Sequence, residues 1–290
     1  MTEENYDAAS WHEWHEKRNQ DLAAEHGWLS LISFTWLSEE RSWLGDFPGI
    51  WYANHDAAVA SFQRSAVPSD AVPVTRDGVD FLGEAVFELA EGESDFSLVA
   101  GTRVAEVAKR GGRYCVRVRD SIAPTRLQFE GVPTYGYTPQ AIVPAAFTAY
   151  EAPRTVAIDT ARKGVTSTAT LVGEVSFSYD GVACTLAVSG DPAENLTAIF
   201  YDETNGSETA DWRFVSFPGP DSADISDDDV SDDGARGLTI DFNRALNFPA
   251  SFTPFGTCPR PAPGNSLAVA VRAGEKRSAA WINPNHAREN

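Results

Sequence analysis

The sequence has few cysteines and no long apolar run. Cys115, Cys184 and Cys258 stand far apart and are odd in number. This spacing argues against a disulfide framework and against a thiolate zinc cage, which needs closely spaced pairs. No stretch of about 18 apolar residues occurs, so we expect no membrane partner. The first residues are acidic and polar, unlike a secretory signal, and we therefore expect a cytoplasmic protein.

Basic residues are scarce relative to acidic ones. Lysine and arginine total 23 against 42 aspartates and glutamates, which gives a net charge of −19, and only four of the 23 are lysines. Such carboxylates hold water and cations, and their repulsion is screened over about 3 Å at 1 M salt. Two interpretations stay open, a salt-adapted (halophilic) protein and an ordinary acidic one. We expect no nucleic-acid partner, because like charges repel and no basic stripe occurs.

Several motifs that would indicate a cofactor or a reaction are missing. The chain has no Gly-x-Gly-x-x-Gly, no phosphate-binding Gly-x-x-x-x-Gly-Lys-Ser/Thr and no Gly-x-Ser-x-Gly. We therefore predict no cofactor. His12 and His15 stand three residues apart, a spacing that can hold a metal, but a third ligand is not evident. A solvated helix face is the competing interpretation, and we predict no metal site.

The N-terminal part of the chain has helical spacing. Tyr6, Trp11, Trp14 and Leu22 recur among charged residues, which predicts a helix over residues 6–26. The dense apolar stretch 27–44 indicates a second short helix or turn. From residue 46 onward, short apolar runs alternate with Gly, Asp, Asn and Pro. We therefore expect a helical N-terminal arm, residues 1–45, and a β-rich domain, residues 46–290.

The pattern after residue 46 predicts a mainly β fold. The segment around Asp180-Gly181 is a two-residue hairpin signal. Strands at this spacing without long helices between them favour an antiparallel sandwich or barrel. The expected strands share short apolar character between turn residues: 57–62, 79–87, 96–100, 103–108, 114–119, 125–129, 141–149, 155–159, 168–172, 174–179, 182–188, 197–201, 213–217, 238–242 and 268–272.

The segment 218–237 is rich in aspartate, with seven between Asp221 and Asp233. A calcium loop needs a central glycine and a closing glutamate, and both are absent at the required positions. A solvated acidic hairpin tip is the favoured interpretation, and weak cation binding is the alternative.

The stretch 241–259 mixes groups that an ordinary core strand does not need. It contains Asp241, Asn243, Arg244, Asn247 and Cys258, together with three prolines. Arg244 offers a planar fork that suits a carboxylate or phosphate, and the two amides donate and accept. The same groups can equally fix a loop through a buried ion pair. Ligand binding and loop fixing both stay open, and Cys258 is either a buried structural thiol or a nucleophile.

This stretch resembles the signature of the domain of unknown function 1684 (DUF1684) family. The resemblance runs from about residue 27 to 276, although Ala250 stands where the family has a cysteine. It implies possible site residues at further motif positions in this chain. These are Asp120 and Arg126, Arg213 of the Arg213-Phe214 pair, Asn265 after the proline-rich turn, and Glu275 of Ala273-Gly274-Glu275-Lys276.

Three hypotheses of function follow. In the first, an aromatic-lined pocket with Arg126, Arg213 and Arg244 binds a small anionic metabolite. In the second, a hydrolase uses Asp241 or Glu275 as general base, and the arginines stabilise negative charge. In the third, the polar residues only fix turns of an interaction scaffold. We favour the binding module, because no nucleophile–base pair is evident from the spacing; whether the protein is an enzyme, and its oligomeric state, stay open.

Overall fold

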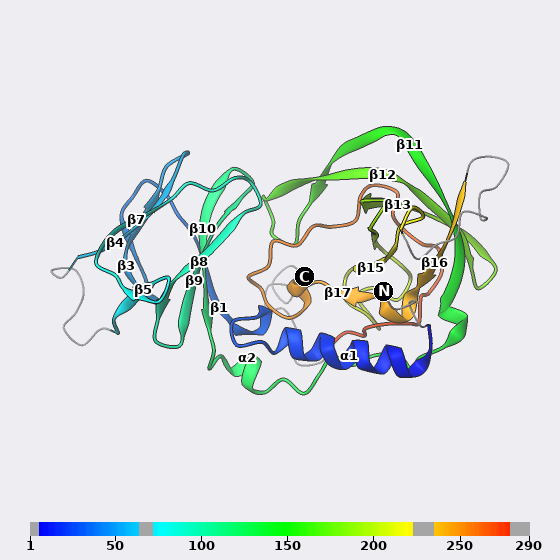
Figure 1. Ribbon diagram of the computed structural model, residues 1–290, viewed down its shortest axis with the longest axis horizontal. Coiled ribbons are helices and arrows are strands. Elements are labelled where there is room, and N and C mark those ends of the chain that lie inside the picture. Colours follow the sequence, from blue (N-terminus) through cyan, green and yellow to red (C-terminus); the bar gives the residue numbers. More distant parts are fainter. Residues whose placement is uncertain (1–5, 64–71, 223–234, 279–290) are drawn as a thin grey trace. The chain divides into compact units, whose positions relative to one another are not determined.

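The computed structural model describes residues 6–63, 72–222 and 235–278 (Figure 1). The fold is mainly β, with three antiparallel sheets and one longer helix, α1 (Ala8–Leu22). The chain divides into two compact units, residues 1–19 with 131–290 (unit 1) and residues 20–130 (unit 2). The predicted mainly β class is confirmed, and no sheet closes into a barrel among its described strands. The predicted boundary between an arm, 1–45, and a domain, 46–290, stays a prediction.

Unit 2 is a sandwich of two sheets. Side chains from both, such as Trp51, Phe62, Leu98 and Val116, are buried in one core. The four-stranded sheet has the order β2 (Ser42–Leu44), β3 (Phe47–Ala53), β4 (Ala58–Phe62) and β7 (Gly83–Phe87). The six-stranded sheet has the order β1 (Leu31–Trp36), β10 (Arg113–Asp120), β9 (Arg103–Arg110), β8 (Ser94–Ala100), β5 (Val74–Arg76) and β6 (Val79–Asp80).

Unit 1 is built on one seven-stranded sheet. Its core joins this sheet to the irregular C-terminal chain, which contributes Leu267, Val269, Val271 and Ala273. Short 3-10 turns lie before, between and after its strands: η2 (Pro139–Ala141) precedes β11, η3 (Phe242–Arg244) lies between β16 and β17, and η4 (Pro249–Ser251) follows β17. The sheet order is β16 (Arg236–Asp241), β11 (Ile142–Asp159), β12 (Thr166–Tyr179), β13 (Val182–Gly190), β14 (Asn195–Phe200), β15 (Arg213–Pro218) and β17 (Leu246–Asn247).

The hairpin predicted at Asp180-Gly181 is confirmed. Tyr179 pairs with Val182, and both turn residues have positive φ, 49° at Asp180 and 78° at Gly181. This is the backbone that a two-residue type I′ turn requires. β12, the strand before the turn, is continuous where two strands, 168–172 and 174–179, were expected. Gly173 interrupts the apolar pattern of β12, but a Cβ there would lie 2.5 Å from the Thr148 carbonyl oxygen of β11, so the glycine permits close strand approach.

The helix or turn predicted over residues 27–44 is wrong for most of its length. Only η1 (Trp28–Ser30) is helical, and β1 and β2 follow it. Phe34, Thr35 and Trp36 are β-branched or aromatic and pair with β10. A short, dense apolar run has no clear period, so its length and composition are better guides than its density.

Two predicted strands are also absent. Residues 125–129 begin with α2 (Pro124–Leu127), because Pro124 at the first helical position has the φ that a helix needs. Residues 268–272 alternate between buried and exposed as a strand does, but no strand is assigned there. The carbonyl of Val271 instead accepts a hydrogen bond from the side chain of Arg213.

Other features bear less directly on function. Among the described residues, none of the helices has the length and apolar character needed to cross a membrane. The acidic hairpin tip predicted within 218–237 falls largely on residues 223–234, outside the described part of the chain.

Candidate functional site

Hydrogen bonds connect Asp241, the last residue of β16, to the polar residues that follow it. Asp241 Oδ1 accepts from the backbone nitrogen of Asn243 at 2.9 Å and from its Nδ2 at 2.8 Å. The Asn243 amide also binds Thr138, accepting from its nitrogen at 3.0 Å and donating to its carbonyl oxygen at 2.9 Å. Trp11 Nε1 donates to the Asn243 carbonyl oxygen at 2.9 Å. These contacts fix η3 against α1 and against the segment at Thr138, just before η2.

Arg244 is the residue that was expected to anchor an anion. It lies against Asp241, against α1 and against Tyr6 just before α1. Its Nε is 3.5 Å from Asp241 Oδ2, and its Nη2 donates to Ser10 Oγ at 3.2 Å. The guanidinium also lies 6.0 Å from the Tyr6 ring and 5.9 Å from the Trp14 ring. The described contacts of Arg244 therefore connect the helix to the sheet.

Glu275 is completely buried, and both of its carboxylate oxygens are occupied. Oε1 accepts from Arg18 Nε at 3.0 Å, and Oε2 accepts from the backbone nitrogen of Asn247 at 2.7 Å. Asn247 Nδ2 donates in turn to the Lys276 carbonyl oxygen at 2.9 Å. The general-base role of Asp241 or Glu275 stays a prediction, and Glu275 would have to exchange these partners to take a proton from a substrate.

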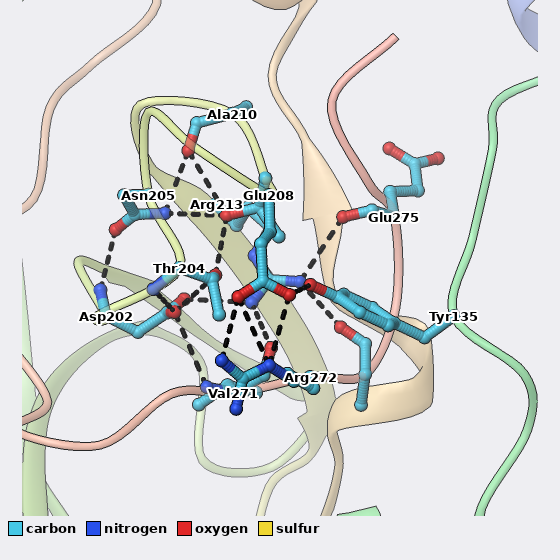
Figure 2. A network of polar contacts seen from close by, with 12 residues as sticks. Tyr135, Asp202, Thr204, Asn205, Glu208, Ala210, Arg213, Val271, Arg272 and Glu275 are labelled. Carbon is cyan, nitrogen blue, oxygen red and sulfur yellow. Dashed lines mark hydrogen bonds and ion pairs between the residues drawn. The ribbon is translucent and has the colours of Figure 1, made fainter.

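Arg213 is fully buried at the centre of a polar network (Figure 2). Its Nη2 is 2.8 Å from Asp202 Oδ2 and donates to the Val271 carbonyl oxygen at 2.8 Å. Its Nη1 donates to the carbonyl oxygens of Ala273 at 2.6 Å and Glu275 at 3.3 Å. One guanidinium thus provides the donors that a neighbouring strand would provide to the C-terminal chain.

The turn that holds Asp202 is fixed by its own side chains (Figure 2). Asp202 Oδ1 accepts from the backbone nitrogen of Thr204 at 2.7 Å. Asn205 Oδ1 accepts from the Asp202 nitrogen at 2.6 Å, and Asn205 Nδ2 donates to Ala210 at 2.8 Å. At the exposed side, Glu208 binds Arg272 at 2.9 Å and accepts from the Tyr135 hydroxyl at 2.9 Å. Burial and Glu208 raise the pKa of Tyr135 to about 12, so this hydroxyl is protonated at neutral pH.

Asn265 joins β13 to β14 where the two strands separate. The two strands pair only through Ser189 with Thr197 and Gly190 with Leu196. The Asn265 side chain accepts from the Ala187 nitrogen at 2.9 Å and donates to the carbonyl oxygens of Ala187 at 2.8 Å and Ile199 at 2.9 Å. The amide therefore continues the sheet in place of a backbone peptide.

Replacing Asn265 with alanine is expected to lower the free energy of unfolding by about 2 kcal/mol, because three partly buried backbone groups lose their partner. Urea unfolding at pH 7 measures this. Ser266→Ala is the matched control, because that neighbouring side chain is exposed. Equal unfolding midpoints for the two variants would contradict the strand-joining role.

The remaining predicted residues have other contacts. The Cys258 thiol is buried, and an added Cβ on Gly256 would lie 3.3 Å from its sulfur. Asp120 and Arg126 belong to unit 2. Asp120 Oδ2 pairs with Arg103 at 3.0 Å, and Arg126 donates to the carbonyl oxygens of Ala23 at 2.9 Å and Ser121 at 2.8 Å.

No group of three or more His, Cys, Asp or Glu side chains in the described ranges is placed to hold a metal ion. His15, one of the two histidines considered, stacks on Trp11 with ring centroids 5.5 Å apart.

A groove of about 280 Å³ lies beside the proline-rich turn of unit 1, at the end of β11. Arg260 lines it, and its guanidinium lies 4.6 Å from the Trp212 ring while its Nε donates to the Thr160 carbonyl oxygen at 3.2 Å. Trp212 is held by its own hydrogen bond to the Pro259 carbonyl oxygen at 2.9 Å. The Nη groups of Arg260 form no hydrogen bond with the residues that the structure describes.

Sequence reasoning did not select Arg260 as a site residue. The signal was present, since Arg260 stands between Pro259 and Pro261, where the backbone is restricted to extended conformations. A cation on such a stiff loop can bind a ligand with little loss of backbone conformational entropy. The residues that the sequence pattern selects have more polar neighbours in sequence than Arg260 has, and most of them are buried.

Comparisons with known proteins give a family. The chain matches the family described as "Protein of unknown function (DUF1684)" over residues 127–276. No curated protein matches it. Among solved structures, it is similar to the solution NMR structure of an uncharacterized protein of Haloarcula marismortui, at 28% identity over 54% of this chain and 82% of that chain, with a TM-score of 0.42. Because the family match covers more than half of the sequence and includes the signature 241–259, the chain belongs to the DUF1684 family.

Proposed function

We propose that unit 1 binds a small organic anion in the groove beside the proline-rich turn. The observation that carries this proposal is the Arg260 guanidinium, which is oriented by Trp212 and Thr160 and keeps its Nη edge unpaired among the described residues. A guanidinium fork of this kind suits bidentate contact with a carboxylate. Arg213 and Arg244, which suggested anion binding in the sequence, make contacts with other residues of the protein and do not line the groove.

The groove favours a carboxylate over a phosphate dianion. Asp159 lines the same groove as Arg260, and the whole chain has a net charge of −19. Repulsion grows with the charge of the ligand, so a monoanion loses less than a dianion. The hydroxyls of Tyr201 and Ser266 also line the groove and offer hydrogen bonds to a hydroxy acid. The volume of about 280 Å³ fits a small ligand.

Arg260→Ala is expected to weaken binding of a small carboxylate at least 10-fold, because Arg260 is the only cationic side chain among the described residues that line the groove. Calorimetric titration with lactate, succinate and inorganic phosphate at pH 7 measures this. Asp159→Asn is expected to strengthen carboxylate binding several-fold in 0.1 M KCl and less in 2 M KCl, where salt screens the repulsion.

Arg272→Ala is the matched control, since Arg272 is exposed and pairs with Glu208 outside the groove. It is expected to bind as the wild type does. The proposal fails if none of the three probes binds, or if Arg260→Ala and Arg272→Ala bind them equally well. Binding of phosphate or of succinate, which is a dianion at pH 7, without binding of lactate would contradict the preference for a monoanion.

A further inference from the structure

Unit 2 has a larger pocket, of about 510 Å³, at one end of its sandwich. The turn between β2 and β3 lines one side, and the turn between β8 and β9 lines the other. Both sheets therefore contribute to it. This volume lies within the range of about 300–1,000 Å³ that small-molecule sites occupy. None of the residues considered as a site in the sequence lines this pocket, although Asp120 contacts one that does.

An exposed tryptophan lies at this pocket. Trp43 is 56% exposed and Val72 is 50% exposed, while Leu44 and Phe47 beneath them are buried. Trp43 pairs through the backbone with Ile50 of β3, so its strand position is fixed. An indole left in water offers a flat apolar face together with one polar N–H group. Such a face suits a ligand that has its own flat apolar side.

The polar groups of the pocket include both a donor and an acceptor. Arg103 donates from Nε to Asp120 at 3.0 Å and from Nη1 to the Asp46 carbonyl oxygen at 2.8 Å. Its Nη2 and the Asp46 carboxylate form no hydrogen bond with the described residues. Burial alone would raise the pKa of Asp120, but hydrogen bonds from Ile122, Thr102 and Arg103 outweigh it and the pKa is lowered. Asp120 therefore stays charged and compensates Arg103.

This combination leads to one class of ligand. The Arg103–Asp120 pair is neutral and Asp46 adds a negative charge, so the described residues of the pocket offer no further cation to an anion. We infer that the pocket binds a neutral saccharide, with a sugar ring against Trp43 and its hydroxyls on Arg103 and Asp46. The C–H face of a sugar ring packs on an aromatic face, and neighbouring hydroxyls match a guanidinium donor and a carboxylate acceptor.

Saturation-transfer NMR of the full chain with glucose, galactose, maltose and cellobiose tests this inference. At least one probe is expected to bind saturably in the millimolar range. Trp43→Ala is expected to weaken it at least 10-fold, and Asp46→Asn several-fold with unchanged melting temperature. Leu82→Ala is the control, since Leu82 is 61% exposed outside the pocket, and Arg260→Ala, which tests the groove of unit 1, leaves saccharide binding unchanged.

Three results would overturn the inference. One is that none of the four sugars binds. Another is that Trp43→Ala and Asp46→Asn bind a sugar as tightly as the wild type does. The third is that benzylamine, added as an amphipathic cation, binds in a Trp43-dependent manner while the sugars do not, which would assign the pocket to an aromatic amine.

Discussion

Replacing Arg213 with alanine is expected to lower the free energy of unfolding by about 3–5 kcal/mol, the loss found when one partner of a buried ion pair is removed. The side chains of Arg213 and Asp202 are both fully buried and lie 2.8 Å apart. The substitution leaves the Asp202 carboxylate without its cation and removes the donor to Val271 and Ala273. The C-terminal chain from Leu267 to Ala273, which completes the core, then loses its attachment.

Urea unfolding at pH 7 measures the effect, and two variants control it. Arg272→Ala removes a neighbouring arginine whose side chain is 63% exposed, and an exposed pair contributes about 0–1 kcal/mol. Arg213→Lys keeps the charge but lacks the planar fork, so it is expected to lie between the wild type and Arg213→Ala. A midpoint for Arg213→Ala within error of that for Arg272→Ala would contradict the assigned role. The same result would reopen a ligand-binding role for Arg213.

The sequence predicts elements well where a single local rule applies. The hairpin at Asp180-Gly181 and the helix within 6–26 follow from turn chemistry and helical spacing. Prediction from sequence fails where side chains from distant segments form the hydrogen bonds that the backbone of a neighbouring strand would otherwise form. Residues 268–272 have a strand pattern but are held by Arg213, and Asn265 completes a gap between β13 and β14. No local pattern contains these partners, because they come from other parts of the fold.

The candidate site shows the same limit. The stretch 241–259 has a chemically unusual composition, and its contacts give the reason. Asp241, Asn243 and Arg244 connect η3 to the segment at Thr138 and to α1. Sequence spacing does not tell a satisfied polar group from an open one, since satisfaction depends on strand order. Arg260, with neutral neighbours on a stiff loop, was the less conspicuous residue and keeps an unpaired edge within the described chain.

A second large effect is expected at Glu106, a buried carboxylate of β9. It accepts from Arg117 Nη1 at 2.7 Å and from Arg119 Nη2 at 2.6 Å, and Ser94 Oγ donates to it at 3.0 Å. Both arginines come from β10, where Arg117 pairs directly with Glu106. Glu106→Gln is expected to lower the free energy of unfolding by about 3 kcal/mol at pH 7, because two buried guanidiniums lose the carboxylate that they share.

The pH dependence of this loss distinguishes a charge effect from a packing effect. Burial alone would raise the pKa of Glu106, but Arg117 and Arg119 and the hydrogen bonds outweigh it, so the folded pKa lies below the ordinary value of 4.5. A lowered pKa stabilises the fold fully above the unfolded value, and this contribution is lost as the pH falls through the folded value. The difference between wild type and Glu106→Gln is therefore expected to be constant from pH 7 to about 5 and to shrink below about 4. Urea unfolding across this range measures it, with Glu84→Gln, an exposed carboxylate of β7, as the control. A difference that persists unchanged at acid pH would show that the glutamine disturbs packing and that the shared charge contributes little.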